Sequence, residues 1–141
     1  MLDNNFKFCR EELEMTQEEL GFVFGVHKST ISGWENGYNF IPFKKLVKFC
    51  NLYNFSFDFV CGLSRRNEKY PKIKLDKKQI GKKLKETRIK LGLTQQQIAD
   101  ECAISQTTYC TYEKGLYLVS TMTLYTICKK HNLSMDDILR K

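Results

Sequence analysis

The amino-acid sequence predicts an all-α protein made of two tandem copies of one small helical domain. The first observation is an internal repeat, because the second half of the chain matches the first at a shift of 78 residues over about 60 positions, without a gap. The second is that apolar residues recur at helical spacing in both copies, so that no strand is predicted. Each copy is short enough that its apolar side chains must form the core.

The second helix of the first repeat has the clearest boundaries. Thr16 can accept a hydrogen bond from an unpaired amide at the helix start, and Glu18 and Glu19 place carboxylates near the positive end of the helix dipole. Gly25 permits the left-handed backbone that often follows a helix. We therefore expect a helix over 16–24.

Periodicity, proline and glycine place the other helices of this repeat. Gly37 ends the third helix, and Pro42 opens the fourth because its missing amide costs nothing in a first turn. Ser56 caps a short fifth helix. The expected ranges are 2–13, 28–36, 42–52 and 56–62.

The second repeat predicts the same five helices. Their expected ranges are 77–91, 94–102, 105–114, 121–131 and 134–140. Between the repeats lies a polar, basic segment broken by Pro71, which we expect to be extended and partly mobile. The expected boundaries are 1–63 for the first domain, 64–76 for the linker and 77–141 for the second domain.

The stretch that contains Phe55, Phe57 and Phe59 alternates as a strand would. It nevertheless falls on the last turn and helix of the second repeat, so the repeat assigns it to a helix. We expect Phe57 or Phe59 to be exposed for contact with a second copy of the chain.

The net charge of +7 is spread unevenly along the sequence. Residues 1–63 carry 6 basic and 8 acidic side chains, residues 64–79 carry 7 and 2, and residues 80–141 carry 10 and 6. A basic second half joined by a basic connector suits a polyanion, since basic side chains near phosphates release bound counterions.

The six cysteines do not form a recognisable site. They are scattered singly, without a Cys-x-x-Cys pair, and the chain has only two histidines. We expect buried thiols, no metal and no cofactor, with redox sensing as the alternative. No apolar run is long enough to span a bilayer and no signal peptide is recognised, so we expect a cytoplasmic protein with no membrane partner.

The second and third helices of each repeat follow the plan of a helix-turn-helix. One face of the third helix carries apolar residues for packing, namely Val26, Ile31 and Trp34 in the first copy and Ile104, Tyr109 and Tyr112 in the second. The opposite face offers short donors and acceptors. Glutamine can pair with adenine, lysine with guanine, and a threonine methyl can contact a thymine methyl. The pattern therefore predicts a helix that reads the major groove.

The residues from Gly25 to Gly37, Gly-Val-x-Lys-Ser-Thr-Ile-Ser-x-Trp-Glu-Asn-Gly, together with the preceding Thr-Gln-x-x-Leu, resemble the Cro and lambda-repressor-like family of DNA-binding domains, also called the xenobiotic-response-element type. The second copy is similar, with Tyr-Glu-Lys-Gly in place of Trp-Glu-Asn-Gly. The resemblance covers residues 2–63 and 80–139. It implies two tandem five-helix lambda-repressor-like domains joined by a short basic connector.

The resemblance also implies a set of residues that contact DNA. The helix-turn-helix motif adds further residues on the outer faces and at the ends of the third helices. In the first copy these are Gln17, His27, Lys28, Ser29, Thr30, Ser32, Gly33 and Asn36. In the second copy they are Gln95, Ser105, Gln106, Thr107, Thr108, Thr111 and Lys114. It further implies two structural ion pairs, Arg10 with Glu35 and Arg88 with Glu113.

One position departs from the family. Gly33 stands where the family usually has Arg, Lys or Gln, which removes one base or phosphate contact. Together with the excess of acidic residues in the first repeat, this indicates that the second repeat carries more of the DNA binding.

The sequence therefore predicts a regulator that binds double-stranded DNA and has no catalytic activity, since no nucleophile–base set or phosphate-cradling loop is present. A repressor of a phage, mobile-element or bacterial operon is expected, because almost all residues belong to the two repeats. The alternative is a protein-interaction module on the same fold, such as an antitoxin or an inhibitor of a host defence complex. The two functions can also be combined, with one domain bound to DNA and the other to a protein partner.

The connector is long enough for both domains to act on one duplex. Fully extended, residues 64–75 span about 40 Å at roughly 3.3 Å per residue. Successive major-groove faces lie about 34 Å apart. One chain can therefore place both third helices on one side of DNA, and tethering then strengthens binding. Homodimerisation is the other arrangement, and the sequence does not choose between them.

Overall fold

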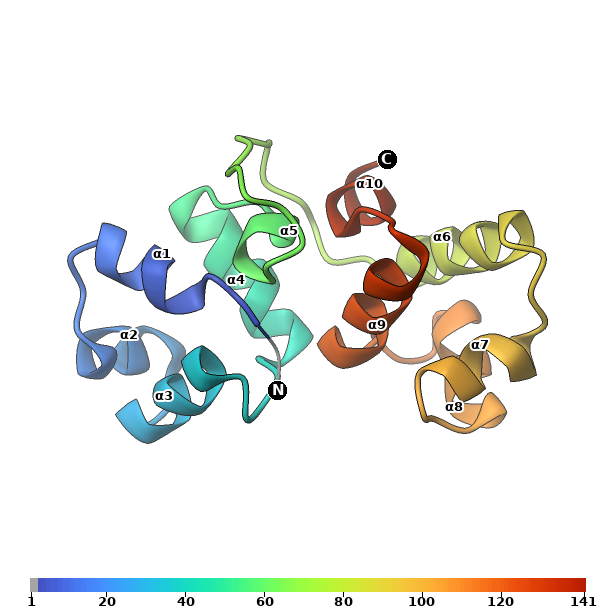
Figure 1. Cartoon of the computed structure of the whole chain (residues 1–141), viewed down its shortest axis with the longest axis horizontal. Helices are drawn as coiled ribbons and strands as arrows, with labels where there is room; N and C mark the ends of the chain where they lie inside the picture. The colour runs from blue at the N-terminus through green and yellow to red at the C-terminus, as the bar shows by residue number, and fades with distance from the viewer. Residues whose placement is uncertain (1–2) are drawn as a thin grey trace. The chain divides into compact units, whose positions relative to one another are not determined.

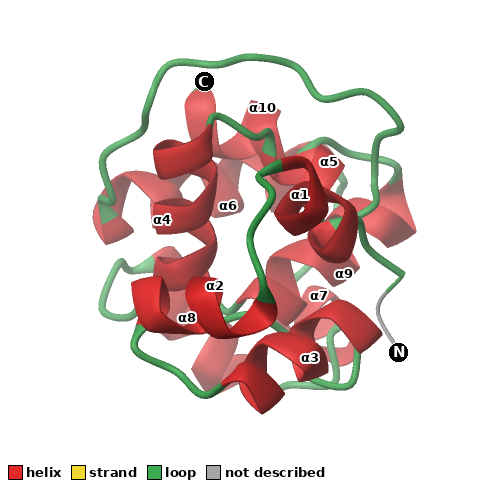
Figure 2. Ribbon diagram, turned by 90° about the vertical axis from the view of Figure 1, so that its left-hand side faces the viewer, coloured by secondary structure: helices red, strands yellow, loops and turns green. Residues whose placement is uncertain are grey.

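The computed structural model describes residues 3–141, and its helices fall into two units that divide between Lys72 and Ile73 (Figure 1). This division lies within the predicted linker 64–76, whose bounds stay a prediction. The described residues form helices and loops only (Figure 2). The prediction of an all-α chain with two helical domains is confirmed.

Each unit contains five helices within the described residues. The first unit has α1 Phe6–Glu12, α2 Gln17–Phe24, α3 Lys28–Asn36, α4 Phe43–Tyr53 and α5 Phe57–Val60. The second has α6 Lys77–Lys90, α7 Gln95–Glu101, α8 Gln106–Glu113, α9 Thr121–His131 and α10 Met135–Arg140. No helix in the described part of the chain combines the length and apolar character needed to cross a membrane.

Helix boundaries differ from expectation mainly in the first unit. The helix expected over 2–13 begins at Phe6 and is capped at its end by Leu13, while Leu2 lies outside the described residues. Pro42 is the residue before α4 rather than its first member, with an extended ψ of 141°. A residue in that conformation ends the preceding loop, so the helix starts one position later.

The core of the first unit is largely aromatic. Phe6 stacks on Phe49 with ring centroids 4.7 Å apart, and its edge meets Trp34 at 5.7 Å. Fully burying a large apolar side chain stabilises a fold by about 1.5–3 kcal/mol. The core of the second unit is mainly aliphatic, and its largest fully buried side chains are Leu84, Ile98, Tyr109, Leu124, Ile127 and Met135.

The expectation that Phe57 or Phe59 would be exposed is wrong. Phe57 is completely buried and Phe59 is 8% exposed. Ser56 begins α5 by accepting a hydrogen bond from the amide of Phe59, which turns the segment into a helix and both rings toward the core. Alternation along the sequence therefore did not correspond to alternation of exposure.

The beginning of the connector is attached to the first unit. The side-chain oxygen of Asn67 accepts a hydrogen bond from the amide of Ser56 at 2.8 Å, and its amide group donates to the carbonyl of Asn54 at 3.3 Å. The expected extended, partly mobile segment is thus fixed by hydrogen bonds as far as Asn67. Residues 68–76 have no regular secondary structure.

Gly81 allows α6 to lie directly against the end of α8. A Cβ atom at Gly81 would stand 2.4 Å from the carbonyl oxygen of Tyr112 and 2.6 Å from that of Glu113. These are backbone atoms that cannot turn away. The close approach fixes the end of α8 relative to α6 and so helps to position the outer face of α8.

Candidate nucleic-acid interface

The second helix of each unit begins with the same capping arrangement. In α2 the Thr16 hydroxyl accepts from the amide of Glu19, whose carboxylate accepts in return from the amide of Thr16. In α7 Thr94 and Gln97 make the equivalent pair of bonds. These reciprocal bonds fix where each helix starts and leave its first amides directed outward.

In both units, one residue between the second and third helices has a left-handed backbone conformation. Gly25 has a φ of 67°, and at the matching place in the second unit Ala103 has a φ of 55°. A side chain at positive φ is uncommon and costs energy. The sequence identified the first turn by its glycine, whereas alanine gave no comparable signal for the second.

In the first unit, α3 presents a polar outer face. His27 caps the helix by accepting at Nδ1 from the amide of Ser29, at 3.1 Å. Ile31 and Trp34 anchor the opposite face, with 0% and 4% exposure. The expected contact residues lie outside this core: His27, Lys28, Ser29 and Asn36 are exposed, and Thr30, Ser32 and Gly33 are half-buried.

The second unit presents α8 in the same way. Ser105 caps it by accepting from the amide of Thr108, at 3.0 Å, and Tyr109 is fully buried beneath it. The expected contact residues Ser105, Gln106, Thr107, Thr108 and Lys114 are exposed, and Thr111 is half-buried. Of the apolar residues assigned to packing, Tyr109 is buried, whereas Ile104 and Tyr112 are half-buried, as is Val26 in the first unit.

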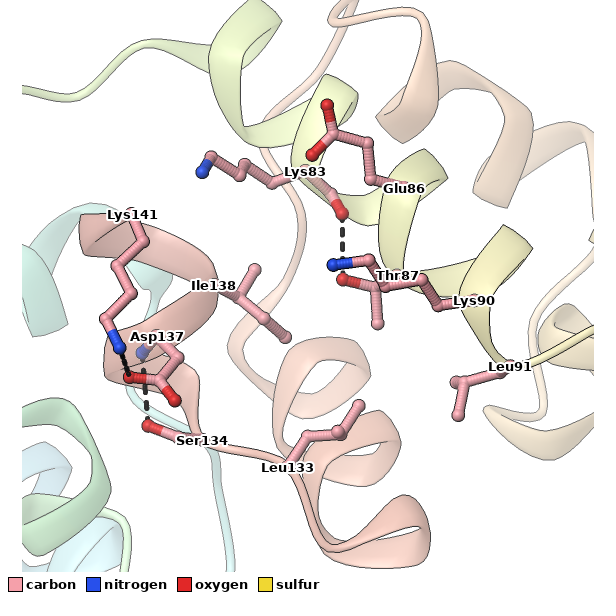
Figure 3. Close-up of a pocket in the computed structure, with 10 residues that line it drawn as sticks. All are labelled: Lys83, Glu86, Thr87, Lys90, Leu91, Leu133, Ser134, Asp137, Ile138 and Lys141. Atoms are coloured by element: carbon pink, nitrogen blue, oxygen red, sulfur yellow. Dashed lines mark hydrogen bonds and ion pairs between the residues drawn. The ribbon is translucent and has the colours of Figure 1, made fainter.

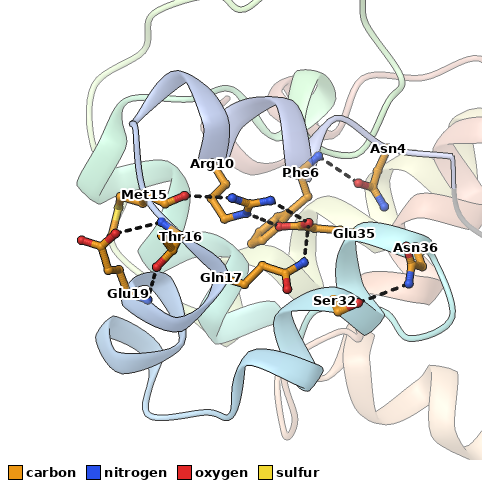
Figure 4. A network of polar contacts seen from close by, with 10 residues as sticks. All are labelled: Asn4, Phe6, Arg10, Met15, Thr16, Gln17, Glu19, Ser32, Glu35 and Asn36. Carbon is orange, nitrogen blue, oxygen red and sulfur yellow. Dashed lines mark hydrogen bonds and ion pairs between the residues drawn. The ribbon is translucent and has the colours of Figure 1, made fainter.

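A buried ion pair holds the end of each third helix. Arg10 donates two hydrogen bonds to Glu35, with nitrogen–oxygen distances of 2.6 and 3.2 Å, and a third to the carbonyl of Met15 (Figure 4). Arg88 and Glu113 form the same pair in the second unit, at 2.7 and 3.2 Å. Each arginine therefore connects the first helix, the following turn and the third helix.

The two glutamines at the start of the second helices belong to these networks. Gln17 donates from Nε2 to Glu35 at 3.1 Å, and Gln95 donates from Nε2 to Glu113 at 3.0 Å. One hydrogen of each side-chain amide group is therefore used within the protein, and the second can still be donated to a phosphate. The backbone amides at the helix start are further donors to a phosphate at this place, so the predicted contacts of Gln17 and Gln95 stay a prediction.

The electrostatics of the second pair favour the ionised forms. Burial opposes ionisation of Glu113, but hydrogen bonds from Arg88 and Gln95 outweigh burial and hold its pKa below the ordinary value. The bond to Glu113 likewise raises the pKa of Arg88. The carboxylate therefore stays charged at neutral pH and keeps the third helix in place.

The residues at the ends of the third helices differ between the units. Asn36 donates to the hydroxyl of Ser32 at 3.3 Å, while the exposed Lys114 follows α8 as its capping residue. Beyond them Tyr38 is 73% exposed, and Leu116 and Tyr117 are 56% and 66% exposed. These apolar residues were not among the predicted contact residues, although their place after the helix-ending glycine was a usable signal.

The cysteines offer little reactive surface. Five of the six are buried, and Cys110 on α8 is half-buried. Burial raises the pKa of Cys9 to about 12 and that of Cys102 to about 11. These two thiols are therefore protonated at neutral pH. Among residues 3–141 no three His, Cys, Asp or Glu side chains gather in a way that could hold a metal ion.

The two units differ in the packing of their first and fifth helices. In the second unit a groove of about 290 Å³ lies between α6 and α10 (Figure 3). Its lining includes Glu86 and Asp137, which match Phe8 and Phe59 in the first unit. Those two phenylalanine rings meet edge to face at 5.9 Å. The repeats thus diverge here while the geometry of the third helices is kept.

Comparisons with known proteins find similarities to helix-turn-helix proteins. A helix-turn-helix family model matches residues 6–60, and a helix-turn-helix domain model matches residues 81–141. The HTH-type transcriptional regulator YgzD of Bacillus subtilis (strain 168) is 30% identical over 56 residues, which cover 40% of this chain and 85% of that protein. The crystal structure of the clp gene regulator ClgR from C. glutamicum is 25% identical, with a TM-score of 0.43 over 48% of this chain and 87% of that one.

The matched segments contain both capped second helices, both third helices and both buried ion pairs. The curated relative is matched over most of its own length. The chain therefore belongs to the helix-turn-helix family of DNA-binding transcriptional regulators, which is not a family of enzymes, and it carries two such domains in tandem.

Proposed function

We propose that the chain is a repressor that occupies an operator in double-stranded DNA, with the outer faces of α3 and α8 in the major groove. The operator would belong to a phage, a mobile element or a bacterial operon, and the protein would act in the cytoplasm. The residues that contact DNA would be those predicted from the sequence, from Gln17 to Asn36 in the first unit and from Gln95 to Lys114 in the second. Arg10, Glu35, Arg88 and Glu113 would be structural.

The outer face of α8 is the observation that carries this proposal. Gln106 and Thr107 are exposed, and within the described residues their side chains make no hydrogen bond. The opposite face is fixed by Tyr109 and by the Arg88–Glu113 pair. A rigid helix that presents unpaired polar groups to solvent is suited to base edges, which supply the missing partners.

The second unit would contribute more of the affinity than the first. Residues 80–141 carry an excess of four basic side chains, whereas residues 1–63 carry an excess of two acidic ones. At the groove-facing position 33 the first unit has only a hydrogen atom. Phosphate neutralisation, which dominates affinity for DNA, therefore favours the second unit.

One specific feature favours a contact with protein in the first unit. Phe22 on α2 is 89% exposed, and the second unit has Asp100 at the matching position. An apolar ring with this exposure offers a partner protein a contact that the second unit lacks. A combined function, with the second unit on DNA and the first on a second copy or another protein, is the alternative proposal.

Selection of bound fragments from random duplex DNA by the full-length protein tests the main proposal. Enrichment of a defined site is expected. Its affinity should fall by about a hundredfold between 50 and 200 mM salt if roughly four phosphates are neutralised. Failure to enrich any site, together with no binding to duplexes at low salt, would overturn it. The number and spacing of enriched half-sites tell whether both units bind.

The Phe22→Asp variant separates the two proposals, because it copies the second unit. If Phe22 contacts protein, the variant retains DNA affinity per protomer but loses self-association or partner binding in sedimentation experiments. An unchanged association state would exclude Phe22 as a protein contact.

A further inference from the structure

A hollow of about 310 Å³ lies on the outer face of α8, within the proposed DNA-binding surface. It is formed by one side of the helix and the loop that follows. Its lining consists of Gln106, Thr107, Cys110, Thr111, Lys114 and Leu116. The chemistry of this lining indicates which bases the second unit would prefer.

Two residues of the lining, Cys110 and Leu116, are apolar. Cys110 is the one cysteine of the six that is not buried, and an uncharged thiol behaves as a small hydrophobic group. Leu116 is 56% exposed beside it. The hydroxyl of Thr111 donates to the carbonyl of Thr108 at 2.6 Å, so its hydrogen is used within the helix rather than offered to a base.

An unpaired carboxamide stands one helical turn before Cys110. Gln106 is the first residue of α8 and is exposed, and its side chain makes no hydrogen bond within residues 3–141. Residues four apart lie on the same helix face. A glutamine can form two hydrogen bonds with adenine, at N6 and N7, and apolar groups contact the C5-methyl group of thymine.

We infer that the second unit recognises A·T base pairs through two adjacent contacts. Gln106 pairs with an adenine, and the hollow formed by Thr107, Cys110 and Leu116 receives a thymine methyl group. This inference rests on the proposed function, since it assumes that α8 lies in the major groove. It makes Cys110 and Leu116, which are not among the DNA contacts predicted from the sequence, determinants of specificity.

The first unit provides an internal comparison. At the positions that match Gln106, Thr107 and Cys110 it has Lys28, Ser29 and Ser32, respectively. These side chains offer an ammonium and two hydroxyl groups, without a methyl group or thiol. Lysine pairs with guanine rather than adenine. The thymine preference is therefore a property of the second unit.

Replacement of thymine by uracil tests the inference, because it removes only the C5-methyl group. In the operator recovered by selection, each thymine is replaced singly and the affinity of the full-length protein is measured. At one position at least the affinity should fall by about fourfold, the value for one buried methyl group. Equal affinities for all substituted duplexes would overturn the inference, while binding itself would leave the proposed function standing.

Two variants assign the effect to the hollow. Cys110→Ser combined with Leu116→Ala should reduce the difference in affinity between the thymine and uracil duplexes, because most of the apolar surface is gone. The control Leu52→Ala, which shortens an exposed apolar side chain on α4 outside the predicted DNA contacts, should keep the wild-type ratio. If the double variant retains the full fourfold ratio, the methyl group is recognised elsewhere and the inference fails.

A second base analogue tests the glutamine. Replacing the neighbouring adenine by 7-deazaadenine removes N7 and should weaken binding of the wild-type protein but not of Gln106→Ala. An equal loss in both proteins would contradict the assignment of Gln106. Circular dichroism of each variant shows that the fold is intact, which is expected because these side chains lie at the surface.

Discussion

The guanidinium of Arg88 and the carboxylate of Glu113 are buried together at the end of α8, with 14% and 3% of their side chains exposed. Arg88 also donates to the carbonyl of Leu93, and Gln95 donates to Glu113. The pair thus joins α6, the turn after it, α7 and α8. The outer face of α8 keeps its orientation because this network fixes the opposite side.

Removing one partner should therefore be much more harmful than removing both. Glu113→Ala leaves Arg88 buried without its partner and should lower the unfolding free energy of the second unit by about 3–5 kcal/mol. The double variant Arg88→Met, Glu113→Leu should recover most of that loss. Urea unfolding followed by circular dichroism measures both changes. A double variant as unstable as Glu113→Ala would contradict this prediction, because the loss of stability would then not come from an unpaired buried charge.

The same carboxylate should make stability depend on acid pH. The pKa of Glu113 is lower in the folded protein than its ordinary value of 4.5, so the folded state binds the proton less readily than the unfolded chain. The resulting stabilisation is present above pH 4.5 and is lost as pH falls through the lowered pKa. Urea midpoints measured across this range should fall less steeply for Glu113→Gln than for the wild type. Parallel curves would exclude a contribution from Glu113.

Trp34 should be essential to the first unit. It is 4% exposed and its ring meets Phe6 and Phe24 edge to face. Trp34→Ala should cost about 3–5 kcal/mol, the usual loss when a core aromatic is emptied. In calorimetry the variant should lose the transition of the first unit and retain that of the second, while Trp34→Phe should retain both. A melting profile unchanged by Trp34→Ala would contradict its role in the core.

Gly33 offers a gain-of-function test of the DNA-facing side of α3. A Cβ atom there would lie 3.0 Å from the side-chain nitrogen of Asn39, which can move away. Gly33→Arg should therefore fold, strengthen binding to the selected operator and increase the slope of log affinity against log salt by about 0.9. Gly33→Ala is the control, since it adds the Cβ without the charge. Identical salt slopes for the two variants would mean that position 33 does not face phosphate.

Gln106 and Thr107 should determine base preference rather than overall affinity. Both side chains are exposed, so Gln106→Ala, Thr107→Ala should leave the fold intact. Discrimination against wrong bases at the contacted positions should fall by about 1–3 kcal/mol. Lys114→Ala, by contrast, should weaken binding to all duplexes alike, as expected for a phosphate contact. Unchanged base preference in the double variant would place the reading surface elsewhere.

Local signals in the sequence predicted most of the helical plan. Thr16 and Thr94 mark the starts of α2 and α7, where each makes the reciprocal capping bonds. The repeat carried the assignment from one unit to the other, including the segment around Phe57. These features are local because a cap, a helix-ending glycine and a 3.6-residue period involve only neighbouring positions.

The tertiary structure decided which polar groups remain available for DNA. Gln17 and Gln95 each donate one side-chain amide hydrogen to Glu35 and Glu113, which lie 18 residues further along the chain, and this leaves one hydrogen of each amide for a phosphate. Phe57 was a candidate for exposure and is fully buried. These hydrogen bonds and this burial depend on which distant segments of the chain pack together, and a local sequence pattern does not predict that packing. The sequence thus determined two capped helical domains with outward third helices, and packing between remote residues determined the chemistry those helices present.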